Sequence, residues 1–382
     1  MIIQVFKPLD SDTETLQLNK MADISMSTSF VYTWRFSDVG DFSLVVEGGT
    51  RFEETLRPGN LLLVDYQYWV RIGDAVRSET AQGYEISITG TDMKGILLQR
   101  ITLYGKQQDT GAMGYDVVQG STETVLKHYI KNNITQPADA ARRIPGFAIA
   151  PDQGRGIVKD TYMSRFEILS ELVTKVCKNA EIGYGVEVDA GASQYIFDVV
   201  VPADLTEGQS VNNRVVFAVD RGNVATMTRT EGITGLRNAF YATKSGGTLV
   251  EDALTQLVYW EGESAPAGIH RRELHLNVSI TEEVAGQELS DIIAAARKEA
   301  TNYLATDSYD CDIKGDYRLG VDYNLGDYVT VRHEVMGTAN KQITEALITY
   351  DSNGARSLKL TFGEKATKIL NALNTKITNK GV

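Results

Sequence analysis

The stretch LRPGNLLLV, residues 56–64, has a counterpart far along the chain in YNLGDYVTV, residues 323–331. In both, a glycine precedes Asn or Asp, and apolar residues then alternate with the period of a half-buried strand. Gly59 and Gly326 can adopt the positive φ that a tight turn demands, and Asn and Asp are common turn residues. The sequence therefore predicts the same element twice, a tight turn that leads into a strand.

Each of these stretches is followed by a second matching segment. EISITG, residues 85–90, corresponds to SLKLTFG, residues 357–363. The two pairs together predict a barrel-like module that occurs twice in one chain. Such a repeat is typical of a part that builds rings, rather than of an enzyme with one cleft.

Composition indicates a strand-rich protein of several domains. The chain has 382 residues, of which 42% are apolar, with 34 Gly, 18 Tyr and only 7 Pro. At ~100–200 residues per domain this is room for two to four domains. The formal net charge of −12 argues against nucleic-acid binding, which favours basic patches. It suits a surface or channel that does not adhere to polyanions.

The N-terminal residues, the apolar runs and the cysteine content do not suggest a secreted or membrane protein. MIIQVFKPLD, residues 1–10, predicts a strand and lacks the basic leader and apolar core of a signal peptide. No apolar run approaches the ~18 residues of a transmembrane helix. Cys177 and Cys311 are remote in sequence, so a buried free thiol is expected at Cys177 and no disulfide framework. We expect synthesis in a cytoplasm.

Residues 1–104 predict a first β-barrel, because short alternating segments follow one another with Gly or Pro between most of them. The expected strands are 1–6, 16–26, 29–36, 42–47, 61–66, 69–72 and 84–89.

Residues 105–206 predict an inserted α/β domain. Ser121 can cap a helix that runs to about Asn132. Ser164 and Glu167 have the spacing of a capping box, and apolar residues follow at helical spacing as far as Asn179. These apolar residues are Phe166, Leu169, Leu172, Val173 and Val176, and strands are expected afterwards at 186–188 and 195–201.

The remaining sequence predicts a second barrel that is interrupted by another domain. Residues 207–245 and 309–363 are expected to form the barrel, with strands at 215–219, 224–229 and 239–243 before the interruption. Residues 246–308 carry an Ala-rich helix from Ser290 to about Leu304. Residues 364–382 predict a short amphipathic helix, with Ile369, Leu370, Leu373 and Ile377 at helical spacing.

No catalytic, cofactor-binding or metal-binding residues are predicted. His128, His270, His275 and His333 do not form an HExxH motif. Nucleophile-elbow, P-loop and dinucleotide-binding patterns are also missing from the sequence. The acids Asp307, Asp310, Asp312 and Asp316 resemble the start of a calcium loop, but Lys314 and Val321 stand where ligands are needed.

Over essentially its whole length, the chain resembles the hub proteins at the tail tip, or baseplate, of long-tailed phages (the N-terminal module of tail-associated proteins). The likeness rests on six segments in the order that the family shows. They are residues 40–44, 57–61, 88–92 leading to Leu97, 238–241, 323–329 and 358–363.

This resemblance implies an α+β, mainly β fold with two tail-tube-like β-barrel domains and two inserted α/β domains. It implies a homotrimer whose six barrels adapt a threefold tip to a sixfold tail tube and gate the channel. The implied partners are the distal tail protein ring, the tape-measure protein and receptor-binding proteins of the virion, with DNA passing without specific binding. The alternatives are a cell-wall-degrading glycosidase or peptidase and the hub of a contractile injection device.

Overall fold

The protein is mainly β, with 49% of the described residues in strands and 16% in helices. A computed structural model describes residues 1–9, 15–25, 29–47, 52–80, 83–103, 115–244, 256–259, 265–278, 288–315 and 317–363. The chain divides into two compact units. The first comprises residues 1–227 and 310–362, and the second is built around residues 228–309. The expected helix in residues 364–382 lies outside the described residues.

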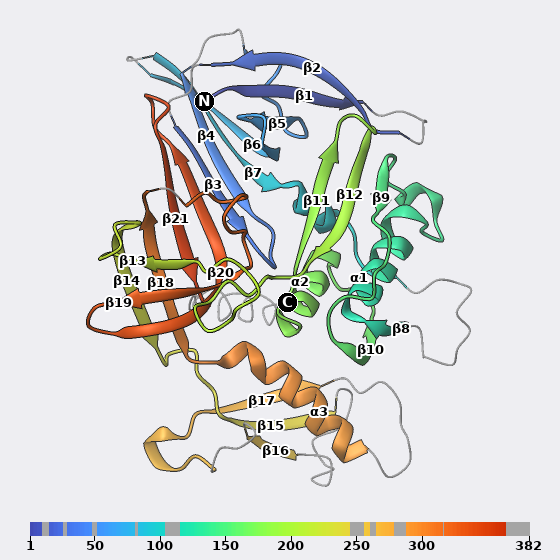
Figure 1. Ribbon diagram of the computed structural model, residues 1–382. Coiled ribbons are helices and arrows are strands. Elements are labelled where there is room, and N and C mark those ends of the chain that lie inside the picture. Colours follow the sequence, from blue (N-terminus) through green and yellow to red (C-terminus); the bar gives the residue numbers. More distant parts are fainter. Residues whose placement is uncertain are drawn as a thin grey trace. The chain divides into compact units, whose positions relative to one another are not determined.

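A thirteen-stranded sheet dominates the fold (Figure 1). Its strands are β1 (Ile3–Leu9), β2 (Gln17–Ile24), β3 (Ser29–Arg35), β4 (Asp41–Glu47), β5 (Leu61–Val64), β6 (Tyr68–Thr80), β7 (Gly83–Asp92), β13 (Val216–Ala218), β14 (Val224–Gly232), β18 (Thr306–Ile313), β19 (Tyr328–His333), β20 (Gly337–Tyr350) and β21 (Arg356–Phe362). Its main path runs β14-β18-β21-β20-β3-β4-β7-β6-β5-β1-β2, and β19 pairs with both β13 and β20.

The sheet contains the same strand order twice. In the first module the order is β3-β4-β7-β6-β5-β1, and in the second it is β14-β18-β21-β20-β19-β13. Strands in equivalent places also follow one another in the same order along the chain. The modules differ in their first strand, because β1 is antiparallel to β5 whereas β13 is parallel to β19. The expected internal repeat is therefore present in the strand order.

The two matching turns have the same geometry. Gly59 has φ +92° and Gly326 has φ +100°, as the third residue of a type II turn requires. The N–H of Gly59 donates to the Ile72 oxygen at 2.8 Å, and that of Gly326 donates to the Ile343 oxygen at 2.8 Å. The same two isoleucines donate back to the residue after each glycine. The positive φ expected from the sequence is confirmed at both sites.

The strand register after each turn is also repeated. Leu61 pairs with Arg71 in the first module, and Tyr328 pairs with Gln342 in the second. A register shift follows one residue later in both, after Ile72 in β6 and after Ile343 in β20. A bulge increases the local twist and bends its strand, so β6 and β20 are bent at equivalent places.

Neither module closes into a barrel by itself within the described residues. Closure requires that every edge strand find a partner. Instead β3 of the first module pairs with β20 of the second, from Glu345↔Arg35 to Tyr350↔Phe30. The two modules are thereby joined in one sheet, and the expected pair of separate barrels is corrected to this continuous sheet.

Phe36 connects three parts of the first unit. It follows β3 and is only 5% exposed. A Cβ on Gly326 would lie 2.1 Å from its ring, and a Cβ on Gly183 would lie 2.4 Å from it. The ring therefore occupies space that only glycine leaves, between the second-module turn and the inserted domain.

The inserted domain has its own core of helices and strands. Its elements are β8 (Asp116–Ser121), α1 (Thr122–Ile130), β9 (Phe147–Ile149), β10 (Val158–Ser164), α2 (Leu169–Asn179), β11 (Gly183–Asp189) and β12 (Gln194–Val200). β10 pairs with β8, and β12 lies between β11 and β9. Ser121 accepts a hydrogen bond from the Thr124 N–H at 3.2 Å, so the expected cap of α1 is confirmed.

The expected capping box is wrong. α2 begins at Leu169, with Ile168 as its N-cap, so the helix starts several residues later than expected. The Ser164 hydroxyl bonds the Glu167 side chain at 3.0 Å and that of Thr102 at 2.7 Å. Phe166 has φ +59° and is 53% exposed, because a turn separates β10 from the helix. The apolar positions from Leu169 onward are buried in α2 as expected.

The second unit contains a three-stranded sheet and a helix. Its elements are β15 (Ala239–Lys244), β16 (Gln256–Tyr259), β17 (Glu273–Val278) and α3 (Glu288–Ala300). β15 is antiparallel to β16 and parallel to β17. β15, which the sequence assigned to the second barrel, thus belongs to this separate sheet. Ile292 and Ala296 of α3 are buried with Phe240 of β15 in one core.

The two turn glycines differ in what surrounds them, and this gives a first prediction. Gly59→Ala meets no atom within 4 Å and introduces only backbone strain, at a cost of about 1 kcal/mol. Gly326→Ala adds a clash with the enclosed Phe36 ring, which costs about 1–3 kcal/mol more. Thermal or chemical unfolding of the two variants measures the difference.

Gly185→Ala serves as the control, because a Cβ there meets open space and the residue is not in the left-handed region. Combining Gly326→Ala with Phe36→Ala should recover part of the loss, since the two residues are in contact. Equal destabilisation by Gly59→Ala and Gly326→Ala would contradict the role of Phe36.

Candidate functional site

One face of the large sheet is polar, and it is the broadest candidate surface in the first unit. Side chains alternate between the faces of a strand. Phe30, Phe42, Leu44, Ile88 and Ile348 point to the apolar side and are buried. Strand pairing aligns the residues between them on the opposite face. The hydroxyl residues of that face include Ser29, Thr33, Ser43, Ser78, Ser87, Thr89, Thr91, Thr349, Ser357 and Thr361, and Val31, Val45, Val76 and Leu347 lie among them.

Carboxylates outnumber cations on this polar face. Its acids on β4, β6, β7 and β20 are Asp41, Glu47, Asp74, Glu85 and Glu345, and its cations on β3, β6 and β21 are Arg35, Arg71 and Lys359. Arg35 is already bound to Asp41 at 2.5 Å and to Glu345 at 3.2 Å.

Two exposed acids of this face lie directly opposite each other. Glu47 of β4 pairs with Glu85 of β7, and both are exposed. Directly opposed like charges destabilise a sheet. The two carboxylates therefore add negative charge to this face at a cost in stability.

The acids that resembled a calcium loop lie on a strand. Asp310 and Asp312 belong to β18, so they are two residues apart on one face of the sheet. Asp310 accepts a hydrogen bond from the Thr361 hydroxyl at 2.7 Å, and Asp312 accepts one from Thr226. They extend the acidic face, and no group of three potential metal ligands occurs among the described residues, which omit Asp316.

The histidines have separate partners. His128 bonds Asp116 at 2.7 Å, His275 bonds Thr243 at 2.8 Å, and the Nδ1 of His333 accepts from two backbone N–H groups of its own turn. His270 lies in a short 3₁₀ turn.

Both cysteines are free and buried. Burial raises the pKa of the Cys311 thiol to about 12 and also raises the pKa of Cys177. Neither thiol is therefore an activated nucleophile, because the thiolate is the reactive form.

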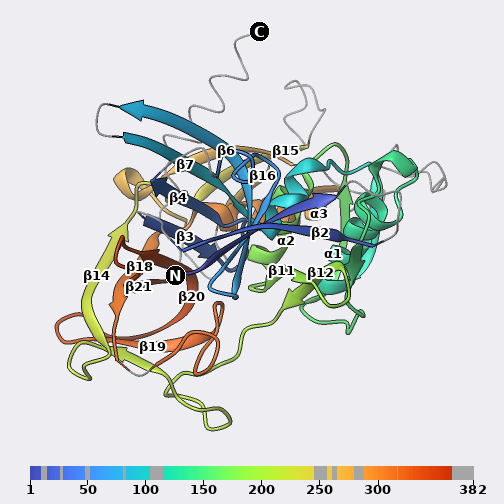
Figure 2. The same cartoon turned by 90° about the horizontal axis from the view of Figure 1, so that it is seen from above.

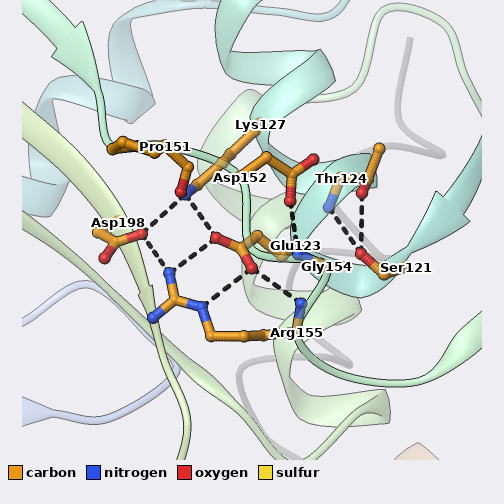
Figure 3. A network of polar contacts seen from close by, with 9 residues as sticks. All are labelled: Ser121, Glu123, Thr124, Lys127, Pro151, Asp152, Gly154, Arg155 and Asp198. Carbon is orange, nitrogen blue, oxygen red and sulfur yellow. Dashed lines mark hydrogen bonds and ion pairs between the residues drawn. The ribbon is translucent and has the colours of Figure 1, made fainter.

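A network of charged side chains ties the inserted domain together (Figure 3). Glu123 of α1 has a fully buried side chain and accepts from Lys127 at 2.5 Å and from Arg155 at 2.7 Å. The N–H of Arg155 also donates to Glu123 at 2.8 Å. Asp198 of β12 bonds both cations, at 2.9 Å to Lys127 and 2.5 Å to Arg155. The network joins α1, the segment before β10, and β12.

The network sets the protonation state of Glu123. Burial alone would raise the pKa of this carboxyl, but the hydrogen bonds from Arg155 and Lys127 together outweigh burial and lower the pKa. Glu123 is therefore charged in the folded protein, and its negative charge compensates two cations. Because Glu123 is not exposed to solvent, the network has a structural role: it holds α1, the segment before β10 and β12 together.

A second buried pair lies where the sheet meets the inserted domain. Asp92 ends β7 and accepts from the N–H groups of Gly40 and Lys94, each at 3.1 Å. The Lys94 ammonium lies 3.7 Å from Asp92, donates to the Arg35 oxygen and lies over the Tyr184 ring. Burial raises the pKa of Asp92 and lowers that of Lys94. The pair holds the β3–β4 connection in place.

Residues 11–364 match the siphovirus ReqiPepy6 Gp37-like protein family, and the chain belongs to that family. The expected kinship with proteins of long-tailed phages is confirmed. No curated protein sequence matches the chain significantly. No helix in the described residues is long and apolar enough to cross a membrane.

Solved structures of tail proteins share this fold. The 43 kDa tail protein of prophage MuSo2 from Shewanella oneidensis has a TM-score of 0.54 at 15% identity, with 95% of this chain and 98% of that chain covered. A tail protein from Neisseria meningitidis MC58 has a TM-score of 0.56 at 13% identity, with 95% and 97% covered. Prophage tail protein gp18 from Listeria monocytogenes EGD-e has a TM-score of 0.50 at 10% identity, with 99% of both chains covered.

The buried network predicts how stability depends on pH. Glu123→Gln should cost about 3 kcal/mol at pH 7, because it leaves two cations near a neutral amide. The folded pKa of Glu123 is depressed, so its contribution is complete above the unfolded pKa of about 4.5 and is lost as pH falls below it. The difference in melting temperature between wild type and Glu123→Gln should shrink as pH falls below about 4.5.

Glu187→Gln is the matched control, because Glu187 is exposed on the neighbouring β11. It should leave stability unchanged across the same pH range. A constant gap between wild type and Glu123→Gln down to pH 3 would contradict the assigned role of the carboxylate.

Proposed function

We propose that the chain is a structural subunit of a phage tail tip, a baseplate hub protein that acts without catalysis. Three copies form a ring that adapts the sixfold tail tube to the threefold tip and closes or gates the channel. The twofold repeat of one strand order within a single chain carries this proposal. Three such chains present six similar modules, which matches a hexameric ring in number.

In this proposal the domain division is the one expected from the sequence, except that β15 belongs to the second inserted domain. The two tube-like modules are residues 1–104 and residues 207–245 with 309–363. The inserted domains are residues 105–206 and 246–308, and residues 364–382 follow the second module in sequence. The intact strand order on both sides of each insertion supports the division, although β15 pairs outside the second module.

The polar face is proposed to line the channel. DNA carries one charge per ~1.7 Å of helix axis, and a basic wall would bind it. A face of hydroxyls and carboxylates lets DNA and the tape-measure protein pass without adhering. The distal tail protein ring and receptor-binding proteins are the proposed partners in the virion, and the inserted domains supply the movable parts of the gate.

The oligomeric state is the first test. Light scattering on the purified chain should give three times the chain mass of 42.0 kDa over a wide range of concentrations. A stable monomer at high concentration would overturn the ring. Release of soluble fragments from purified peptidoglycan by the protein would overturn the non-catalytic role and favour a cell-wall-degrading enzyme.

Charge reversal on the polar face tests its proposed role. Wild type should not retain duplex DNA at low salt, whereas Glu47→Lys with Glu85→Lys should retain it, because the reversal makes the face basic. Retention should weaken as salt rises. The control is Asp152→Lys with Glu187→Lys, two exposed positions of the inserted domain. Equal DNA retention by wild type and both variants would contradict a channel lined by this face.

A further inference from the structure

The pairing of β3 with β20 shows how one module adds to another. β3 of the first module lies antiparallel along the second half of β20, beyond the bulge at Ile343. The Phe36 N–H donates to the Thr344 oxygen at 3.0 Å. Hydrogen-bonded pairs alternate in an antiparallel ladder, so Ala346, Ile348 and Tyr350 direct their backbone groups to β3.

The first module has an equivalent edge without an added strand. The register aligns Asp74, Ala75, Val76 and Ser78 of β6 with Glu345, Ala346, Leu347 and Thr349 of β20. Beyond Arg71, no strand in the described part of the chain pairs with β6 on the side opposite β7. Val76 in this segment is 60% exposed.

The backbone direction of this edge follows from two observations. By equivalence with β20, the N–H and C=O groups of Ala75, Arg77 and Glu79 point away from β7. The hairpin agrees, because Thr80 pairs with Gly83 across a two-residue loop, and alternation from Thr80 assigns Ser78 and Val76 to the β7 side. Donors and acceptors therefore alternate along this edge of the β6–β7 hairpin (Figure 2). The Ala75 oxygen also accepts a hydrogen bond from the Arg77 side chain at 3.4 Å, and a carbonyl oxygen can accept a second one.

β14, the outermost strand of the second module, is equivalent to β3, the strand that pairs with β20. The β6 edge has no such partner among the described residues. β14 occupies the same place beside β18 as β3 does beside β4. It is the last strand of the sheet path, and no described strand pairs with its outer edge (Figure 1). Thr226, Thr228 and Thr230 are exposed along β14, as Asp74, Val76 and Ser78 are along β6.

We propose that β14 of one copy adds antiparallel to β6 of the next copy, along Asp74–Thr80, and that this contact closes the ring. The inference rests on the proposed ring-forming function and assigns its interface. The junction between copies then repeats the junction that β3 and β20 already make within one chain. Unpaired edges invite association with other chains, and this pairing removes both edges at once.

Proline on the open edge tests the contact. Ala75→Pro and Glu79→Pro each remove an N–H that the β6–β7 ladder does not use, and proline is tolerated at such edge positions. Each variant should still unfold in a cooperative thermal transition, which shows that the chain is folded. Each should elute in size-exclusion chromatography at the mass of one chain. Glu79→Ala, which removes only the side chain, should remain a trimer. A trimer that persists in both proline variants overturns this interface but leaves the ring itself standing.

Cysteine pairs provide a test that does not depend on proline. Ser78→Cys is combined in turn with Thr226→Cys, Thr228→Cys and Thr230→Cys, against a background whose native thiols are buried. Oxidation should link different chains for at least one combination, giving dimers and trimers on a non-reducing gel. Ser78→Cys with Glu187→Cys, a position on the inserted domain, should not crosslink. A trimeric wild type with no crosslink in any β14 combination overturns the proposal, whereas a monomeric wild type overturns the proposed function itself.

Discussion

The backbone ladder between β3 and β20 is the constraint on which the first unit depends. It joins strands more than 300 residues apart in the chain, so the two modules cannot adopt their sheet independently. Arg35 reinforces the end of the ladder by binding both Glu345 and Asp41. Contacts of such long sequence separation are slow to form, and the Phe36 ring and the Asp92–Lys94 pair hold the same corner once it has formed.

The duplicated turns show which features a module needs and which it can vary. Both need glycine at the third position and a polar residue after it, and Asn60 and Asp327 are both buried. Asn60 donates to the Thr55 oxygen at 2.7 Å, whereas Asp327 accepts from the Ala203 N–H at 2.8 Å. In both modules this side chain bonds the backbone of a neighbouring segment, and the choice between amide and carboxylate follows from whether that segment offers an acceptor or a donor.

Local patterns predicted the elements, and long-range pairing could not be predicted. Turn chemistry and alternation were sufficient to predict positive φ at Gly59 and Gly326 and a strand after each turn. A capping pattern failed at Ser164, whose hydroxyl is taken by Thr102, a residue that no local rule connects to it. The spacing of Glu123 and Lys127 is a recognisable helical ion pair, but Arg155 and Asp198 join it only through the fold. Alternation within each strand indicates which residues share a face. It does not indicate that acids from different strands lie together on the polar face, because strand pairing decides that.

The places of the two insertions follow from the same sheet. One inserted domain follows β7, where the first module ends, and the other unit lies between β14 and β18, where the first module has only the short Phe36–Gly40 connection. Both insertions leave through loops, which tolerate added chain without disturbing the pairing of strands. The edges of β6 and β14 remain uncovered among the described residues. An internal junction already uses β3 and β20, so in the proposed ring these two edges are the equivalent surfaces. Repeating one contact between neighbouring copies closes a ring when its rotation closes.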